Sequence, residues 1–295
     1  MSMKKTFPQF LSWILFVMTL QPFYGCAGLD FRIADVAFEN PLLRLGVIND
    51  QPNAQEQAGV LLRLKPPPTN ILKSREETTM YVLIPKKENQ GVQVKLNEFQ
   101  TSFYAPGSQP NTYRVRSESL VEKQSGAVLD KLMDELEVTD RNEIVKLIQG
   151  LHDTESGKFK VTQWTRTPVL PEKPVKIGDT WNYEESMTLV IDPKTDPSQH
   201  KFEAQSKLVG FAVVKGHRCA VIETEAKQIE TERSKILFKN RILYNRAKVQ
   251  ETAYLDHETN VRVAAITKIQ TDTNSTDSKI DIHSVTQSIY YLLAS

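Results

Sequence analysis

Asn89-Gln-Gly-Val-Gln-Val-Lys-Leu-Asn-Glu-Phe99 decides the fold class of this 295-residue chain. The first three residues have the composition of a tight turn. Val92, Val94 and Leu96 then alternate with polar residues, which places the apolar side chains on one face of an extended segment. A turn next to an alternation of period two predicts a β-hairpin over residues 76–103.

Alternation of the same kind predicts strands along most of the chain. Val60-Leu-Leu-Arg-Leu-Lys65 predicts a strand that ends at three prolines, because proline cannot donate to a sheet ladder. Residues 112–119 predict another strand. After residue 157 the pattern returns and continues to the C-terminus. The strands expected in this half are 158–164, 180–191, 202–214, 217–227, 236–245, 248–255, 261–271 and 280–293.

Residues 126–151 show a different period. Apolar residues recur at helical spacing in two groups, namely Leu129, Leu132, Met133 and Leu136, and then Ile144, Leu147, Ile148 and Leu151. Asp140, with Glu143 three residues later, fits a capping box at a helix N-terminus. The pattern predicts two short helices, at 126–137 and 141–151, whose apolar faces pack against a sheet.

The predicted fold class is therefore α+β and mostly β. We expect long, curved antiparallel sheets, shaped like a half-barrel or cradle, with the short helical pair packed on one side. The expected organisation is a signal peptide at 1–25, an entry segment at 26–59, a β region ending in the helical pair at 60–157 and an all-β region at 158–295. The last two regions are expected to form one continuous module.

The N-terminus has the layout of a bacterial secretion signal. Lys4 and Lys5 precede the uncharged, mostly apolar run 10–20, which is shorter than the roughly 18 apolar residues that a membrane-spanning helix needs. An ordinary buried helix or an uncleaved anchor would be the alternative. Removal of residues 1–25 would change the formal net charge from +1 to −1. No basic patch is visible, so the sequence does not predict nucleic-acid binding.

Cys26 ends this N-terminal segment. Phe23-Tyr24-Gly25-Cys26 resembles the lipobox of bacterial lipoproteins, in which the cysteine thiol receives diacylglycerol and becomes the mature N-terminus. The match departs from the family pattern, which prefers Leu and then Ala or Ser where this chain has Phe23 and Tyr24. The resemblance implies a domain tethered by acyl chains to the cell envelope, and Ala27 after the cysteine, where Asp is absent, favours the outer membrane, facing the periplasm. Simple secretion, with cleavage after Ala27 or Gly28, is the alternative.

A second distinctive stretch is Leu170-Pro-Glu-Lys-Pro-Val-Lys-Ile-Gly-Asp-Thr-Trp181. Pro174 holds an extended backbone. Gly178 and Asp179 suit a tight turn, and the Asp179 carboxylate can accept backbone N–H groups beside it. Trp181 begins a strand and can fill the end of a core. We interpret these four residues as structural. The alternative is that Asp179 is a catalytic acid beside a sugar-stacking Trp181.

This stretch resembles a Pro-Val-x-x-Gly-Asp-x-Trp motif in a group of uncharacterised bacterial envelope lipoproteins. In those proteins the motif lies between an initial β region and a final block of strands. Asp256-His-Glu-Thr-Asn260 is similar to the group's later Asp-x-Glu-Thr-Gly turn, with Asn260 where Gly is usual. The resemblance covers residues 60–272. It implies an architecture and no activity.

The sequence predicts no catalytic or metal-binding set. It contains no nucleophile elbow, zinc-protease motif or phosphate loop. The five histidines are scattered, and only Cys219 would remain after lipidation of Cys26, so no metal site and no cofactor are predicted. We expect Cys219 to be a buried, inert thiol in an apolar strand.

The leading hypothesis is a non-enzymatic, membrane-tethered envelope lipoprotein that binds a protein or an apolar, lipid-like ligand on the concave face of its sheet. The alternative is a cell-wall or glycan hydrolase that uses paired carboxylates. Two facing acids inside the sheet would favour the enzyme.

Overall fold

The computed structural model of the protein describes residues 38, 40–84, 90–154, 157–162, 168–190, 198–229, 236–238, 241–275 and 281–293. The predicted signal peptide and Cys26 lie outside these residues. Among the described residues, no helix combines the length and the apolar character needed to cross a membrane.

The described chain contains two short helices, α2 (Pro41–Leu45) and α3 (Ala54–Ala58), and all its other regular elements are strands. The strands are β1 (Ile48–Asp50), β2 (Ile71–Ile84), β3 (Gln90–Pro106), β4 (Thr112–Lys123), β5 (Val128–Thr139), β6 (Ile144–Thr154), β7 (Gly157–Thr162), β8 (Thr180–Val190), β9 (Ser198–Val214), β10 (His217–Ile229), β11 (Ile236–Phe238), β12 (Arg241–Asp256), β13 (Arg262–Ser275) and β14 (Asp281–Leu292). The prediction of a mostly β chain is confirmed.

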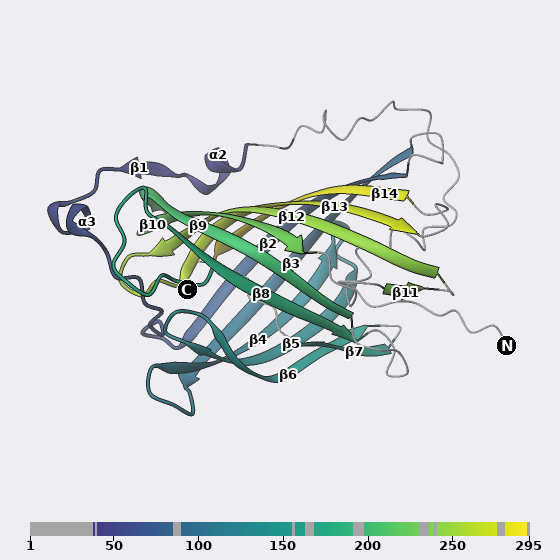
Figure 1. Ribbon diagram of the computed structural model, residues 1–295, viewed down its shortest axis with the longest axis horizontal. Helices are drawn as coiled ribbons and strands as arrows, with labels where there is room; N and C mark the ends of the chain where they lie inside the picture. Colours follow the sequence, from purple (N-terminus) through teal and green to yellow (C-terminus); the bar gives the residue numbers. More distant parts are fainter. Residues whose placement is uncertain are drawn as a thin grey trace.

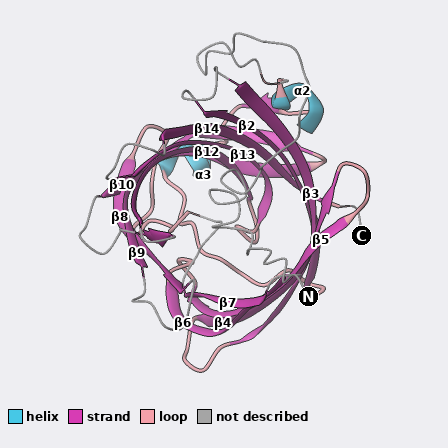
Figure 2. Cartoon of the chain, turned by 90° about the vertical axis from the view of Figure 1, so that its right-hand side faces the viewer, coloured by secondary structure: helices cyan, strands magenta, loops and turns pink. Residues whose placement is uncertain are grey.

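These strands form one antiparallel sheet in the order β1-β9-β10-β12-β13-β14-β2-β3-β4-β5-β6-β7-β8, with β11 beside β12. Strands from both predicted β regions therefore belong to the same sheet. The sheet curves strongly, as Figures 1 and 2 show, and β8 pairs with β9 as well as with β7. The predicted long, curved antiparallel sheet is confirmed. The predicted hairpin is β2–β3, in which Thr78 pairs with Leu96.

The prediction of helices at 126–137 and 141–151 is wrong, because these residues form β5 and β6. The β5–β6 ladder shifts register twice, so that Val138 pairs with Ile144, Leu136 with Leu147 and Asp134 with Gly150. Each β-bulge adds one residue to β6. Positions on one face of β6 consequently recur every third residue, which imitates the spacing of a helix. The turn between the strands is organised by Thr139, whose hydroxyl accepts the backbone N–H groups of Arg141 and Glu143.

The curved sheet has two faces with separate apolar clusters. One cluster contains Leu208, Ile222 and Leu255, and we call the face that carries these residues the inner face. The other cluster contains Val214, Cys219 and Val263, among others, and lies on the outer face. Leu45 of α2 packs against this outer cluster, and α2 lies outside the curve of the sheet in Figure 2.

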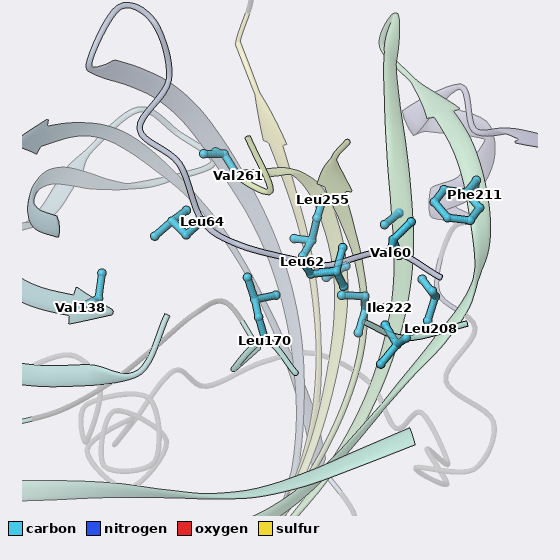
Figure 3. Packing of buried hydrophobic residues seen from close by; sticks show 13 residues of the cluster. Val60, Leu62, Leu64, Val138, Leu170, Leu208, Phe211, Ile222, Leu255 and Val261 are labelled. Carbon is cyan, nitrogen blue, oxygen red and sulfur yellow. The ribbon is translucent and has the colours of Figure 1, made fainter. Parts of the chain in front are cut away.

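The inner cluster is completed by residues 60–64, which cross the sheet at the end near α3. Val60, Leu62 and Leu64 are buried against Leu208, Ile222, Leu255, Val138 and Leu170 (Figure 3). The predicted strand at 60–65 is wrong, because only Val60 forms a bridge, with Val175. Leu61, Arg63 and Lys65 alternate with these apolar residues and are not buried. We call residues 60–65 the plug segment.

Two turns and the stretch before β8 form hydrogen bonds with the plug segment. Leu64 N–H donates to Asp140 O at 2.6 Å, and Lys65 N–H donates to Thr259 O at 2.8 Å. Val60 and Val175 exchange two backbone hydrogen bonds of 2.9 Å. The Arg63 guanidinium donates to the carbonyl oxygens of Pro171 and Glu172. The plug segment thereby joins the β5–β6 turn, the β12–β13 turn and the stretch before β8.

α3 holds the start of the plug segment in place through Glu56, which is 1% exposed. The Glu56 carboxylate accepts the Asn53 N–H in a capping box and also accepts Arg218 Nη2 of β10 at 2.7 Å. A buried carboxylate needs such partners, because an unpaired buried charge is costly. The helix is therefore fixed to the β9–β10 hairpin.

Leu62 and its neighbour Leu61 provide a matched test of the plug segment. Leu62 is 4% exposed and Leu61 is 54% exposed. We expect Leu62→Ala to lower the free energy of unfolding by about 2–5 kcal/mol, because it leaves a cavity in the inner cluster. Leu61→Ala should change it by about 0.5 kcal/mol or less. Urea unfolding of both variants measures the difference, and equal losses would contradict the assignment of the plug segment.

Candidate functional site

A row of polar side chains crosses six neighbouring strands on the inner face. Leu208, Ile222 and Ala253 form paired apolar positions of the inner cluster. Two residues further along each strand, on the same face, the chain places polar residues. The row consists of Ser206, Thr224, Glu251, Thr267, Ser288 and Thr78, each paired with the next across its ladder. We call these six residues the polar row.

Hydrogen bonds link neighbours within the polar row. Thr78 Oγ1 and Ser288 Oγ are 2.8 Å apart, and Ser206 Oγ and Thr224 Oγ1 are 2.7 Å apart. Thr267 Oγ1 donates to Glu251 Oε2 at 3.0 Å. A hydroxyl offers one donor and two acceptor lone pairs, so these pairs leave hydrogen-bonding capacity on the inner face.

Glu251 is the charged member of the polar row, and Arg262 lies beside it. The Arg262 Nη1 and Glu251 Oε2 atoms are 3.5 Å apart, and the two side chains are 8% and 13% exposed. The Arg262 guanidinium also stacks on the Tyr290 ring, with Cζ 3.9 Å from the ring centre. The ion pair and the aromatic ring together hold the guanidinium against the inner face.

Burial raises the pKa of the Glu251 carboxyl above its usual range. The negative charge of Glu76, on the neighbouring part of the inner face, adds to this rise, while the Arg262 charge and the Thr267 hydrogen bond oppose it. Burial likewise raises the pKa of the Tyr104 hydroxyl, and the Tyr290 side chain contributes to that rise. This region of the inner face is therefore a weakly solvated environment that disfavours added negative charge.

Apolar residues flank the polar row on both sides. Toward the plug segment lie Leu208, Ile222, Ala253 and Ala265. Away from it, the next positions are mostly apolar, namely Ala204, Ala226, Val249, Ile269, Thr286 and Met80. On β9, β10, β12 and β13 the polar row is thus a band of hydrogen-bonding groups between apolar positions, whereas on β14 and β2 its neighbours toward the plug segment are Tyr290 and Glu76.

The Gly178-Asp179 motif lies where β8 joins β9. Gly178 has φ +98°, a conformation that L side chains rarely adopt. The Asp179 carboxylate accepts the Lys176 N–H at 2.8 Å, and Leu208 exchanges backbone hydrogen bonds with Gly178 and Asp179. Pro174 is exposed beside the Val60–Val175 bridge. These contacts organise the backbone that leads into β8.

Trp181 follows the turn and pairs with Ser206 at one end of the polar row. Its indole N–H donates to Val169 O at 2.7 Å, and its ring packs against the inner cluster. Tyr183, the next residue on the same face, receives a 3.4 Å hydrogen bond from Ser206 Oγ. The motif therefore brings two half-buried aromatic rings to the end of the polar row.

The second predicted turn, Asp256–Asn260, adjoins the plug segment. Asn260 has φ +54°, as expected for a residue that replaces glycine, and its Nδ2 donates to Arg63 O at 2.9 Å. Burial alone would raise the pKa of the Asp256 carboxyl, but hydrogen bonds from Thr259, His217 and Glu258 lower it. These contacts therefore fix the backbone of the turn and connect it to the plug segment.

Three of the histidines each lie beside a carboxylate. His217 and His283 each contact a separate aspartate, Asp256 and Asp272 respectively, and His257 lies beside Glu56. No group of three or more metal-binding side chains occurs among the described residues.

Alternation in single strands could not identify the polar row. Thr78, Thr224 and Ser288 look like the solvent-facing half of amphipathic strands when each strand is taken alone. Their alignment depends on the pairing of six strands, two of which, β14 and β2, lie about two hundred residues apart in sequence. In the sequence, the polar row is indicated only by two charged residues, Glu251 and Arg262, that stand next to apolar residues within strand segments.

No protein-family model and no curated protein sequence matches the chain. Three solved structures show distant similarity. They are the hypothetical lipoprotein YmcC from Escherichia coli K12 (12% identity, TM-score 0.27, covering 74% of this chain and 87% of that one), a candidate lipoprotein from Parabacteroides distasonis (8%, 0.29, 72% and 92%) and OpdQ from Pseudomonas aeruginosa (8%, 0.27, 76% and 99%). TM-scores this low support no inference about this chain.

Substitution of Trp181 tests whether the motif stabilises the fold. We expect Trp181→Ala to lower the free energy of unfolding by about 3 kcal/mol, because it removes a half-buried ring and a hydrogen bond. Trp181→Phe keeps most of the packing and should cost about 1 kcal/mol. Thermal melts of both variants measure these losses. An unchanged melting temperature for Trp181→Ala would favour an exposed sugar-binding or catalytic role instead.

Cys219 provides a second test. It is fully buried, and burial raises the pKa of its thiol to about 12. Because the thiolate is the reactive form, we expect a thiol reagent to modify Cys219 only after denaturation. Cys26→Ser protein isolates the Cys219 signal from that of the N-terminal cysteine. Rapid labelling of the native protein near neutral pH would contradict this expectation.

Proposed function

We propose that this protein is a membrane-tethered lipoprotein of the bacterial cell envelope that binds a partner on the inner face of its curved sheet. The polar row is the observation that carries the binding role. Buried polar groups lower stability unless they are fully hydrogen-bonded, and a sheet core needs none of them. Six polar residues aligned across six strands, three of them buried, therefore suit recognition better than packing.

The N-terminal sequence supports the tethered location. A basic start, a short apolar run and the lipobox-like Cys26 favour export and acylation. Fourteen residues separate Cys26 from Pro41, the first residue of α2. A fully extended segment of this length reaches about 50 Å, so the sheet can stand away from the bilayer while its acyl chains remain inserted.

A glycan hydrolase is the second candidate function, and one observation favours it. Glu251 and Glu76 interact electrostatically on the inner face, and the pKa of Glu251 is raised, as expected for a general acid beside a second carboxylate. The ion pair of Glu251 with Arg262 argues for a structural or binding role. Loss of cell-wall glycan cleavage in Glu251→Gln protein, with binding retained, would select the enzyme.

The tether is tested by metabolic labelling with palmitate. We expect the wild-type protein to be labelled and to begin at Cys26. Cys26→Ser should accumulate as unlabelled precursor, because its hydroxyl cannot replace the thiol in the transfer. Cys219→Ser is the matched control and should be labelled like the wild type. An unlabelled wild-type protein that begins at Gly28 or Leu29 would indicate simple secretion.

A further inference from the structure

We propose that the inner face binds an uncharged glycolipid, with its sugar head on the polar row and its hydrocarbon chain on the apolar positions beyond it. This inference deepens the proposed function and rests on it for the use of the inner face. The argument depends on three properties of the row, which are its hydrogen-bonding groups, its charge and its apolar surroundings.

The hydrogen-bonding groups of the row match those of a sugar. Five of its six members are hydroxyl side chains, and each can donate or accept. Thr78 and Thr267 are half-buried, whereas Ser206, Thr224 and Ser288 are buried. Tyr183, at the end of the row, offers an aromatic ring against which the apolar face of a pyranose can pack.

The charge of the site excludes a strongly anionic head group. Glu251 and Arg262 cancel each other, and Glu76 adds a negative charge to the same part of the inner face. A phosphate or carboxylate placed there would be repelled in a weakly solvated environment. Hydroxyl groups gain hydrogen bonds at the polar row without adding charge.

The apolar positions set the direction of the chain. The plug segment fills the inner face on one side of the polar row, with Leu62 and Leu64 buried there. On the other side, the half-buried Val249 and Ile269 continue the apolar surface. A hydrocarbon chain attached to a head on the polar row must therefore extend away from the plug segment.

Competition photolabelling of the lipidated protein in lipid nanodiscs tests this inference. The probe is a dodecyl maltoside that carries a diazirine in its alkyl chain, and mass spectrometry locates the labelled peptides. We expect labelling within β12, β13 and β2. Unlabelled dodecyl maltoside should suppress it, whereas dodecanoate, which has an anionic head, and maltose, which has no chain, should compete at least tenfold less well.

Thr78→Val and Thr79→Val form the matched pair of variants. Thr78 belongs to the polar row, and Thr79 lies on the opposite face of the same strand. Thr78→Val should weaken competition by dodecyl maltoside about two- to tenfold, the effect of one lost neutral hydrogen bond, and Thr79→Val should not. Ser288→Ala removes the hydrogen-bond partner of Thr78 and should reproduce the effect if Thr78→Val folds poorly.

Equal competition by dodecanoate and dodecyl maltoside would overturn the inference but leave a less selective binding role for the inner face. Equal effects of Thr78→Val and Thr79→Val, or labelling confined to peptides outside the inner face, would also overturn it. Palmitate labelling at Cys26 is measured independently, so failure of the tether and failure of the glycolipid site are distinguishable.

Discussion

Backbone hydrogen bonding of the plug segment is the constraint on which the arrangement around it depends. Residues 60–65 cross the inner side of the sheet without joining a ladder beyond the Val60–Val175 bridge. Buried backbone groups must still be paired. The carbonyl oxygens of Asp140 and Thr259 supply acceptors from two turns, and the Arg63 side chain binds the stretch before β8. These turns must therefore keep fixed positions relative to one another.

The Gly178-Asp179 turn lies outside the polar row but determines which residues stand at the β9 end of that row. β1 and β8 share one side of β9: Phe211–Val213 pair with β1, and residues 198–207 pair with β8. The Gly178-Asp179 turn bonds to Leu208 between these two regions. By fixing where β8 begins, the turn also fixes the register that places Trp181 opposite Ser206. A backbone motif thereby determines the position of an inner-face side chain.

Most strands could be predicted from sequence, because a sheet with two chemically different faces imposes a period of two. The helix predicted at 141–151 could not be distinguished from β6, since two bulges convert that period into a spacing of three. The plug segment imitated a strand because Val60, Leu62 and Leu64 alternate, although their partners are turns. The polar row required the register of six strands. No local sequence pattern determines the register between strands that are distant in sequence. Alternation alone also does not determine which face of a curved sheet lies on its inner side.

The polar residues of the row stabilise the fold less than apolar residues would, but they offer hydrogen bonds to a ligand. The row contains hydroxyl pairs and the Glu251–Arg262 pair at positions where apolar side chains would cost less desolvation energy. Buried ion pairs are often no more stabilising than apolar residues of similar size. Substitution of the row by apolar residues could therefore preserve or raise stability while removing every directional contact that a ligand head could use. The flanking positions, Leu208, Ile222 and Ala253, already follow the apolar solution on the same strands. On the inner face, the apolar row therefore stabilises the fold, and the adjacent polar row provides the groups that can recognise a ligand.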